Sequence, residues 1–73
     1  MQPAPDWPLT DRELLIIDDL LHGWPNRAIA QHLGVRNETI KNQLTALYTK
    51  VGVSGRVELV LLAVKRGVTK IKA

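Results

Sequence analysis

The sequence predicts an all-α fold, a single domain built as a bundle of four short helices. Clusters of turn-forming residues divide the chain at 23–25, at Gly34 and at 52–55. Within the four segments between these turns, apolar residues recur at helical spacing, as in helices with one buried face. Because the 73 residues include no cysteine, packed apolar side chains rather than disulfides must hold the domain together.

Three regions are expected along the chain. Residues 1–8 contain three prolines and little periodicity, which indicates a flexible arm or the remnant of a linker. The folded domain is expected to span residues 9–68, followed by a C-terminal tail at residues 69–73. A linker at this place would suit a longer protein in which a receiver or sensor domain precedes Met1.

The first predicted helix has a well-marked beginning. Thr10 and Glu13 have the spacing of a capping box, in which each side chain bonds the backbone N–H of the other residue. Leu9 can close a hydrophobic staple with Leu14, and the helix is expected to end near His22. The expected buried stripe is Leu14, Ile17, Leu20 and Leu21, and the residues expected on the opposite side are Leu15 and Asp19.

The second and third predicted helices are joined by a tight turn. The second spans about 26–33 and ends at Gly34, and the third spans about 37–51. A rotation of about 100° per residue separates two sides of the third helix. Its expected core residues are Ile40, Leu44, Leu47 and Val51, with Tyr48 at their edge. Its opposite side, here named the polar strip, consists of Glu38, Lys41, Asn42, Thr45 and Thr49.

The fourth predicted helix is apolar around most of its circumference. It begins near Gly55 with Glu58 at its third position, and it ends with Lys65 and Arg66, whose charge suits the negative end of the helix dipole. Its apolar residues are Val57, Leu61 and Val64, together with Val60 or Leu62. Only one face can enter the core of the domain, so the remaining apolar surface must be covered by something else.

Charge is unevenly distributed along the chain. Residues 1–23 carry one basic and five acidic side chains, a net charge of 1 − 5 = −4. Residues 24–73 carry nine basic and two acidic side chains, a net charge of 9 − 2 = +7. This asymmetry favours a polyanion as the partner of the second region. Because no apolar run is long enough to cross a bilayer, a cytoplasmic protein without a membrane partner is expected.

The turn at Gly34 has the composition of a helix-turn-helix. Ala30 lets the two helices approach, Gly34 permits a positive φ, and Val35 and Ile40 fill the wedge between the helices. Such a corner projects the second helix of the pair outward, and an α-helix fits the major groove of double-stranded DNA. The third helix is therefore expected to be a recognition helix.

Motif residues spread over the predicted domain resemble one family. They are Leu9-Thr10, Arg12-Glu13, Gly23, Pro25-Asn26-Arg27, Ile29-Ala30, Leu33-Gly34-Val35, Thr39-Ile40-Lys41, Leu47, Lys50, Gly52-Val53-Ser54, Arg56 and Glu58-Leu59. From Leu9 to about Val68 the chain resembles the LuxR/GerE-type output domain of bacterial transcription regulators. The resemblance implies a domain that binds DNA as a homodimer, reading the major groove with its third helix and pairing through its fourth.

The resemblance, together with the residues of this sequence, predicts roles for individual side chains. The expected base-reading residues are Lys41, Asn42 and Thr45. The expected phosphate contacts are Arg27, Arg36, Thr39, Thr49 and Lys50. The expected dimer interface is Val57, Val60, Leu61 and Val64. The sequence departs from the family at Arg36, which replaces the usual Ser or Thr cap, so that either Asn37 caps the third helix or Arg36 turns toward phosphate. It also departs at Asp19, where the family usually has an apolar residue.

Other functions are less consistent with the sequence. No nucleophile and base are paired and no glycine-rich phosphate loop occurs, so neither an enzyme nor a cofactor is expected. His22 and His32 lack further ligands at helical spacing and are interpreted as surface residues rather than metal ligands. Trp7 and Trp24 are expected to pack over the ends of the first helix. Two alternatives remain, a sigma-factor promoter-binding domain and a protein-interaction module that has lost DNA binding.

Overall fold

The computed structural model describes residues 9–67 as four α-helices, which confirms the all-α class. The helices are α1 (Asp11–Leu21), α2 (Asn26–Leu33), α3 (Asn37–Val51) and α4 (Arg56–Lys65). These bounds agree closely with the sequence prediction. The predicted arm with Trp7 and the predicted tail lie outside the described residues.

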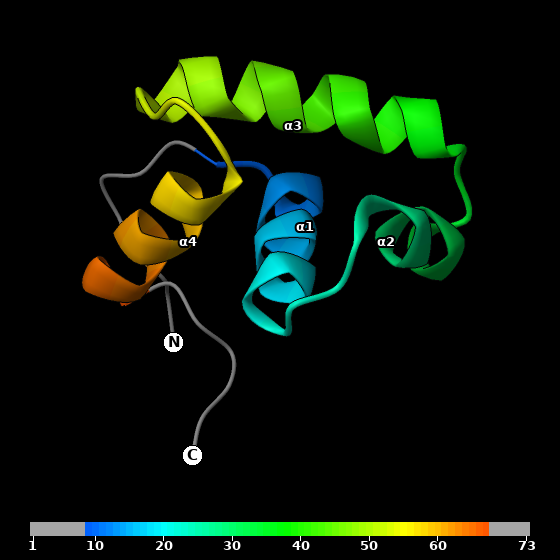
Figure 1. Cartoon of the computed structure of the whole chain (residues 1–73), viewed down its shortest axis with the longest axis horizontal. Coiled ribbons are helices and arrows are strands. Elements are labelled where there is room, and N and C mark those ends of the chain that lie inside the picture. Colours follow the sequence, from blue (N-terminus) through cyan, green and yellow to red (C-terminus); the bar gives the residue numbers. More distant parts are fainter. Residues whose placement is uncertain (1–8, 68–73) are drawn as a thin grey trace.

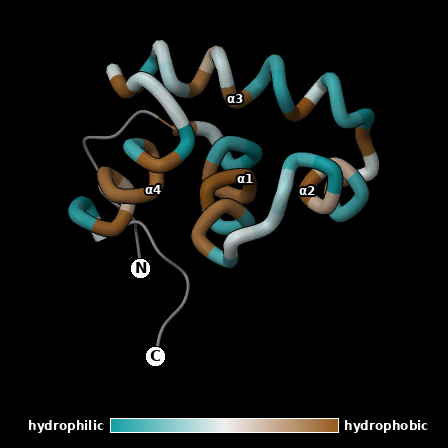
Figure 2. The backbone as a smooth tube through the Cα atoms, viewed as in Figure 1, coloured by the Kyte–Doolittle hydropathy of each residue, from teal (hydrophilic) through white to brown (hydrophobic). Residues whose placement is uncertain are grey.

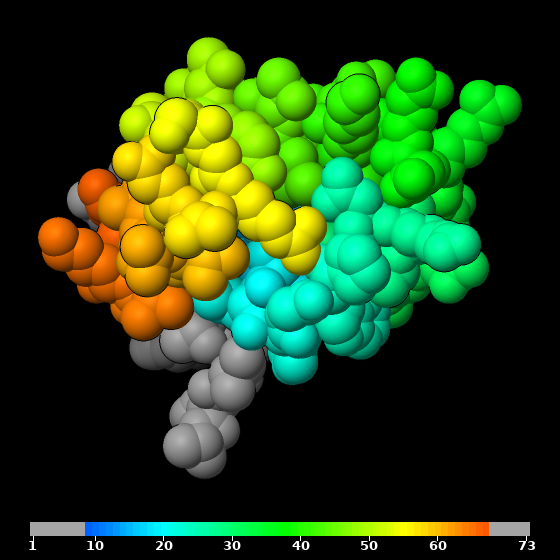
Figure 3. All heavy atoms as spheres, in the orientation of Figure 1, coloured from blue at the N-terminus to red at the C-terminus, as the bar shows by residue number. Residues whose placement is uncertain are grey.

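The helices form two layers. Figure 1 shows α3 lying across one side of the molecule, with α4, α1 and α2 side by side beneath it. In the space-filling view, α3 forms one whole edge of the molecule, and only a small area of α1 is visible between α4 and α2 (Figure 3). The longest helix is therefore also the most peripheral one, and α1 is the central one.

All four helices contribute to one hydrophobic core. Its buried members are Ile16, Ile17, Leu20, Ile29, Ala30, Ile40, Leu44, Leu47, Leu59 and Ala63. The hydropathy colouring shows brown segments of α1, α2 and α4 turned toward one another beneath α3 (Figure 2). Three of the four predicted inner residues of α3 are buried and Val51 is half-buried, so the rotation of that helix is as predicted and its polar strip faces outward.

The local signals in the sequence correspond to observed turns and caps. Thr10 Oγ1 accepts from Glu13 N–H at 3.1 Å and Glu13 Oε1 accepts from Thr10 N–H at 2.8 Å, so the predicted capping box is present. Gly34 adopts φ 70° and ψ 33°, a left-handed conformation that favours glycine. Val35 N–H then donates to the Ala30 carbonyl at 2.9 Å. This turn sets the direction in which α3 leaves α2.

The prediction that Asp19 lies on the exposed side of α1 is wrong. Asp19 is only 3% exposed, and its Oδ2 accepts from His32 Nδ1 at 2.9 Å. The buried face of α1 includes Ile16 beside Ile17 and Leu20, whereas Leu14 and Leu21 of the predicted stripe are only half-buried. A hydrogen bond to a partner on α2 makes the burial of this carboxylate tolerable.

His32 is therefore more than a plain surface residue. Its side chain is half-exposed, but the imidazole joins α2 to α1 through Asp19. The indole of Trp24 meets this ring edge-on at a centroid distance of 5.2 Å, and His22 lies on Trp24 at 6.2 Å. The expectation that Trp24 packs at the end of the first helix is consistent with this small aromatic cluster.

Candidate nucleic-acid interface

The polar strip forms the outer face of α3. All five of its residues, Glu38, Lys41, Asn42, Thr45 and Thr49, are exposed. The inner side of α3 packs on the core shared with the other helices, and its outer side chains form one edge of the molecule in Figure 3. An exposed polar face on a straight, peripheral helix of 15 residues has the shape and the hydrogen-bonding groups needed to enter a major groove.

The two threonines of the polar strip are hydrogen-bonded within the helix. Thr45 Oγ1 donates to the Lys41 carbonyl at 3.0 Å, and Thr49 Oγ1 donates to the Thr45 carbonyl at 3.3 Å. A hydroxyl has only one hydrogen to donate but can still accept. In this conformation each threonine therefore presents an acceptor outward, and it must release its carbonyl before it can donate to a phosphate.

An open hollow lies where the N-termini of α2 and α3 come together. It is lined by Asn26, Arg36, Asn37, Glu38 and Lys41. Pro25 and Arg36 are the N-caps of the two helices, and neither cap makes a side-chain hydrogen bond. Neither Asn37 nor the Arg36 side chain therefore caps α3. The free N–H groups and positive dipole ends of two helices favour an anion beside the two cationic side chains.

Arg56 connects the first turn of α4 to the rim of this hollow. Its Nη1 donates to Asn26 Oδ1 at 3.2 Å, and its Nη2 donates to the carbonyl of Trp24. The guanidinium thus fixes the start of α2 against α4. The sequence marked Arg56 only as a motif residue, because the bond joins positions 30 residues apart and local spacing does not reveal it.

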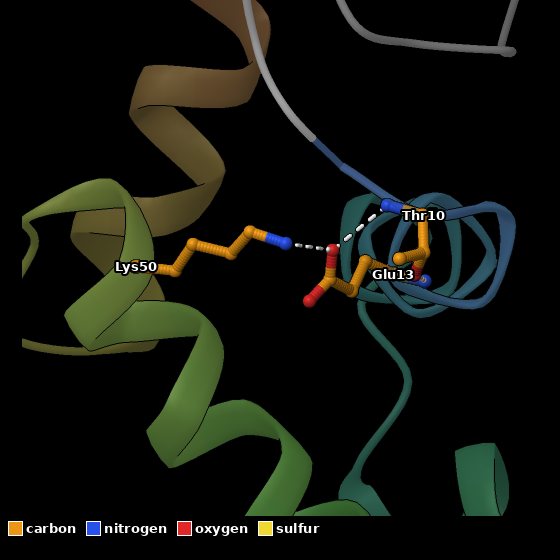
Figure 4. Close-up of polar contacts among 3 residues, drawn as sticks. All are labelled: Thr10, Glu13 and Lys50. Atoms are coloured by element: carbon orange, nitrogen blue, oxygen red, sulfur yellow. Dashed lines mark hydrogen bonds and ion pairs between the residues drawn. The ribbon is translucent and has the colours of Figure 1, made fainter.

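The predicted phosphate contacts lie at the start of α2 (Arg27), at the N-cap of α3 (Arg36) and along α3 (Thr39, Thr49 and Lys50). Arg27, Arg36, Thr49 and Lys50 are exposed, and Thr39 is half-buried. The ammonium group of Lys50 is occupied, because Nζ lies 2.9 Å from Glu13 Oε1 (Figure 4). Thus Arg27 and Arg36 lie at the end of α3 that the hollow occupies, whereas Lys50 is held at the other end.

Glu13 has a carboxylate that is stabilised in its charged form. Partial burial raises the pKa of Glu13, but hydrogen bonds from Thr10 and Lys50 and the positive charge of Lys50 outweigh this effect, so the pKa lies below its ordinary value. The same oxygen accepts from Thr10 N–H and from Lys50. Sequence spacing identified the first of these bonds but not the second, which spans 37 residues.

A separate apolar stripe is exposed on α4. Val57, Leu61 and Val64 are 72%, 64% and 56% exposed and lie at spacings of four and three. Val60, the fourth residue expected at a dimer interface, is half-buried and packs against the core. The side of α4 that enters the core carries Leu59 and Ala63 instead. The surplus of apolar surface expected from the sequence is therefore present as a stripe on one outer face.

The first turn of α4 is ordered by Glu58. Its Oε1 accepts from the backbone N–H and the hydroxyl of Ser54, both at 2.7 Å, and these bonds lower the pKa of Glu58. The predicted N3 position of Glu58 is confirmed. Its charge adjoins Val57 on the outer surface, so the apolar stripe has an acidic group at its beginning and Lys65 at its end.

Two other kinds of site find no support in the described part of the chain. Residues 9–67 contain no group of three or more His, Cys, Asp or Glu side chains that could hold a metal ion. None of the four described helices is long and apolar enough to cross a membrane.

Comparison with known proteins identifies relatives among bacterial regulators. The family described as "Bacterial regulatory proteins, luxR family" matches residues 7–63. The chain is 36% identical to the transcriptional regulatory protein YdfI of Bacillus subtilis over 63 residues, and this aligned segment covers 86% of this chain and 30% of that protein. It is 43% identical over 65 residues to the transcriptional activator protein ExaE of Pseudomonas putida, covering 89% of this chain and 30% of that protein.

A third relative is the transcriptional regulatory protein ComA of Bacillus subtilis, 38% identical over 60 residues that cover 82% of this chain and 28% of ComA. The chain thus spans about 30% of the length of these curated relatives. No solved structure matches the chain. Since the family covers α1 to α3 and most of α4, the chain belongs to the LuxR family of bacterial regulatory proteins, as a helix-turn-helix domain of transcriptional regulators.

Proposed function

We propose that the domain binds double-stranded DNA in a sequence-specific manner, as a homodimer on a two-part site, and thereby regulates transcription. The observation that carries the proposal is the exposure of two different surfaces on two helices. The outer face of α3 is polar and the outer face of α4 is apolar. One surface suits base edges and the other suits a second copy of the chain, so a single domain can use both at once.

Base reading is assigned to Lys41, Asn42 and Thr45 on the polar strip. The amide of Asn42 can bond adenine in two places, and the ammonium group of Lys41 suits the acceptors of guanine or a nearby phosphate. Thr45 presents an acceptor and a methyl group, and the methyl can contact thymine. Because the three exposed residues share one face of α3, they can read neighbouring base pairs.

Phosphate contacts are assigned to both sides of the groove. Arg27 and Arg36, together with the uncapped N-termini of α2 and α3, would hold one backbone strand at the hollow. Thr39, Thr49 and Lys50 would contact phosphates along α3. Such contacts position the protein without reading sequence, so their loss should weaken binding to all duplexes alike.

The apolar stripe on α4 is assigned to the homodimer. Val57, Leu61 and Val64, flanked by Val60, would pair with the same residues of a second copy. A contact of one helix per subunit is small, so the entropy of association opposes dimerisation of the isolated domain. A receiver or sensor domain in a longer protein would then control pairing, which agrees with the greater length of the relatives.

Selection of bound sequences from random duplex DNA tests this function. The expected result is a two-part site with a constant spacing. Against that site, Lys41→Ala and Thr45→Ala should each cost about 1–3 kcal/mol and relax the preference at one position, whereas Arg27→Ala should weaken selected and random duplexes equally. Lys65→Ala, which removes one positive charge from α4, is the control for Lys41→Ala. Equal losses for these two lysines would contradict base reading by Lys41.

Dimerisation is tested separately on the same DNA. Leu61→Asp places a charge at the centre of the apolar stripe and should abolish cooperative occupation of the two half-sites while leaving binding to a single half-site. Leu15→Asp is the matched control, since Leu15 is an exposed leucine on α1. If Leu61→Asp left cooperativity unchanged, the stripe would not be the dimer interface.

The exposed stripe also supports a second candidate, a protein-interaction module without DNA binding. The polar strip contains acidic Glu38 beside Lys41, which reduces its attraction for DNA. A salt series separates the two functions, because DNA binding weakens steeply as counterions compete whereas an apolar interface changes little. Absence of any salt-dependent binding to duplex DNA would favour this second candidate.

A further inference from the structure

The ion pair between Lys50 and Glu13 links the far end of α3 to the beginning of α1. Lys50 belongs to the last turn of α3 and Glu13 to the first turn of α1. Figure 4 shows the Lys50 side chain extended away from α3, with its ammonium group on the oxygen of Glu13 that also accepts from Thr10. The ammonium is therefore held by a group that lies outside the recognition helix.

This pair is open to exchange with another anion. The Lys50 and Glu13 side chains are 35% and 22% exposed, so solvent and an approaching ligand can reach the ion pair. A phosphate offers Lys50 the same kind of charged oxygen acceptor as a carboxylate does. If Lys50 leaves, Glu13 keeps its bond to Thr10 N–H at 2.8 Å and remains in place as the capping residue. Only one contact would therefore be replaced.

Lys50 also lies beside the polar strip. It follows Thr49 by one residue, a rotation of about 100°, which places it on the flank of α3 rather than on the face that points at the bases. With α3 in a major groove, a flank of the helix faces the phosphates that border that groove. The Glu13 carboxylate lies at the same flank because it is bonded to Lys50.

We propose that Glu13 competes with DNA phosphate for Lys50, so that the domain must exchange an internal carboxylate for a phosphate when it binds. This inference rests on the proposed DNA-binding function. Every duplex requires the same exchange, because phosphates carry no sequence information. Glu13 thus lowers affinity for specific and non-specific DNA by the same factor, and base reading by α3 is left unaltered.

Glu13→Gln is the test variant, because glutamine is the other residue that a capping box accepts at this position. The amide oxygen can still accept from Thr10 N–H while the negative charge is removed. Affinity for both a selected site and a random duplex should rise by up to about fivefold, the equilibrium factor that corresponds to a partly exposed ion pair. The dependence of affinity on salt should steepen by as much as one phosphate contact.

Asp11→Asn is the matched control, since Asp11 is an exposed acid in the same turn of α1. It changes the net charge by the same amount but leaves the Glu13–Lys50 pair intact. Its effect on affinity should be clearly smaller than that of Glu13→Gln. In a Lys50→Ala background, the gain from Glu13→Gln should fall to the size of this general charge effect.

Three results would overturn the proposal while leaving the proposed function standing. They are an unchanged affinity in Glu13→Gln, an equal gain in Asp11→Asn, and a full gain that persists without Lys50. Failure of every variant to bind duplex DNA would instead reject the proposed function, and this inference with it.

A measurement on the unaltered domain does not depend on any variant folding. The NMR signal of the Lys50 side-chain nitrogen should report a carboxylate contact in the free domain and a phosphate contact after duplex DNA is added. A Lys50 signal that stays unchanged on DNA binding would show that the pair with Glu13 persists, contrary to the proposal.

Discussion

Two side-chain contacts join α1 to other helices, a hydrogen bond from His32 to Asp19 and an ion pair between Lys50 and Glu13, and they differ in how deeply they are buried. The Asp19 carboxylate is almost inaccessible and bonds His32 on α2, whereas Glu13 and Lys50 form a partly exposed pair with α3. Both distances are 2.9 Å. The same geometry has different consequences, because an inaccessible carboxylate depends on its partner while an exposed one can turn to water. Burial, not distance, separates a structural pair from an exchangeable one.

The largest effect is expected from His32→Ala, which breaks the buried pair from its accessible side. It leaves the Asp19 carboxylate without its partner on α2, and an unsatisfied buried acceptor costs about 1–3 kcal/mol. Urea unfolding monitored by circular dichroism measures the loss. His22→Ala is the control, because His22 also contacts Trp24 but bonds only the Asp18 carbonyl at the surface. Equal losses for the two histidines would show that Asp19 does not depend on His32.

A smaller effect is expected from Asp19→Leu. It removes the carboxylate together with the need for a partner, and the family resemblance indicates that an apolar residue is usual at this position. Replacement of a buried pair by an apolar residue is often neutral or stabilising, so unfolding free energy should stay close to that of the parent. In this background His32→Ala should cost much less than it does alone, and a double-mutant cycle measures the coupling between the two residues.

A loss of stability of about 0.2–1 kcal/mol is expected from Glu13→Gln at neutral pH, because the pair with Lys50 is partly exposed. The pKa of Glu13 is lowered in the folded state from the ordinary value of 4.5. Its contribution is therefore complete above pH 4.5 and is lost as the pH falls through the lower folded pKa. Unfolding curves of parent and variant should converge in acid. Curves that stay equally far apart down to the lowest pH would contradict this linkage.

The positions of the helices could be predicted from the sequence because their signals are local. Thr10 and Glu13 lie one turn apart, and Gly34 needs only its own φ to end α2. The outer face of α3 could also be predicted from the sequence, because apolar residues at helical spacing define its inner side without reference to other helices. These features depend on residues that are neighbours in the chain.

The partners that cross between helices could not be predicted. Asp19 and His32 lie 13 residues apart, and Arg56 reaches Trp24 over 32. Their contacts depend on how the helices pack, which helical periodicity does not specify. The apolar circumference of α4 posed the same problem, because its spacing left open which face enters the core, and the residues buried there are Leu59 and Ala63.

The Arg56 guanidinium joins α4 to Trp24 and Asn26, and this contact bears on the spacing between the half-sites of the proposed two-part DNA site. Because Arg56 fixes α2 against α4, a dimer formed through α4 would hold its two recognition helices at a fixed distance and orientation. Each base pair inserted between half-sites turns the second one by about 34° and shifts it by about 3.4 Å. A rigid dimer could not follow this combined rotation and shift. The DNA sites that such a dimer binds should therefore all have the same number of base pairs between their two half-sites.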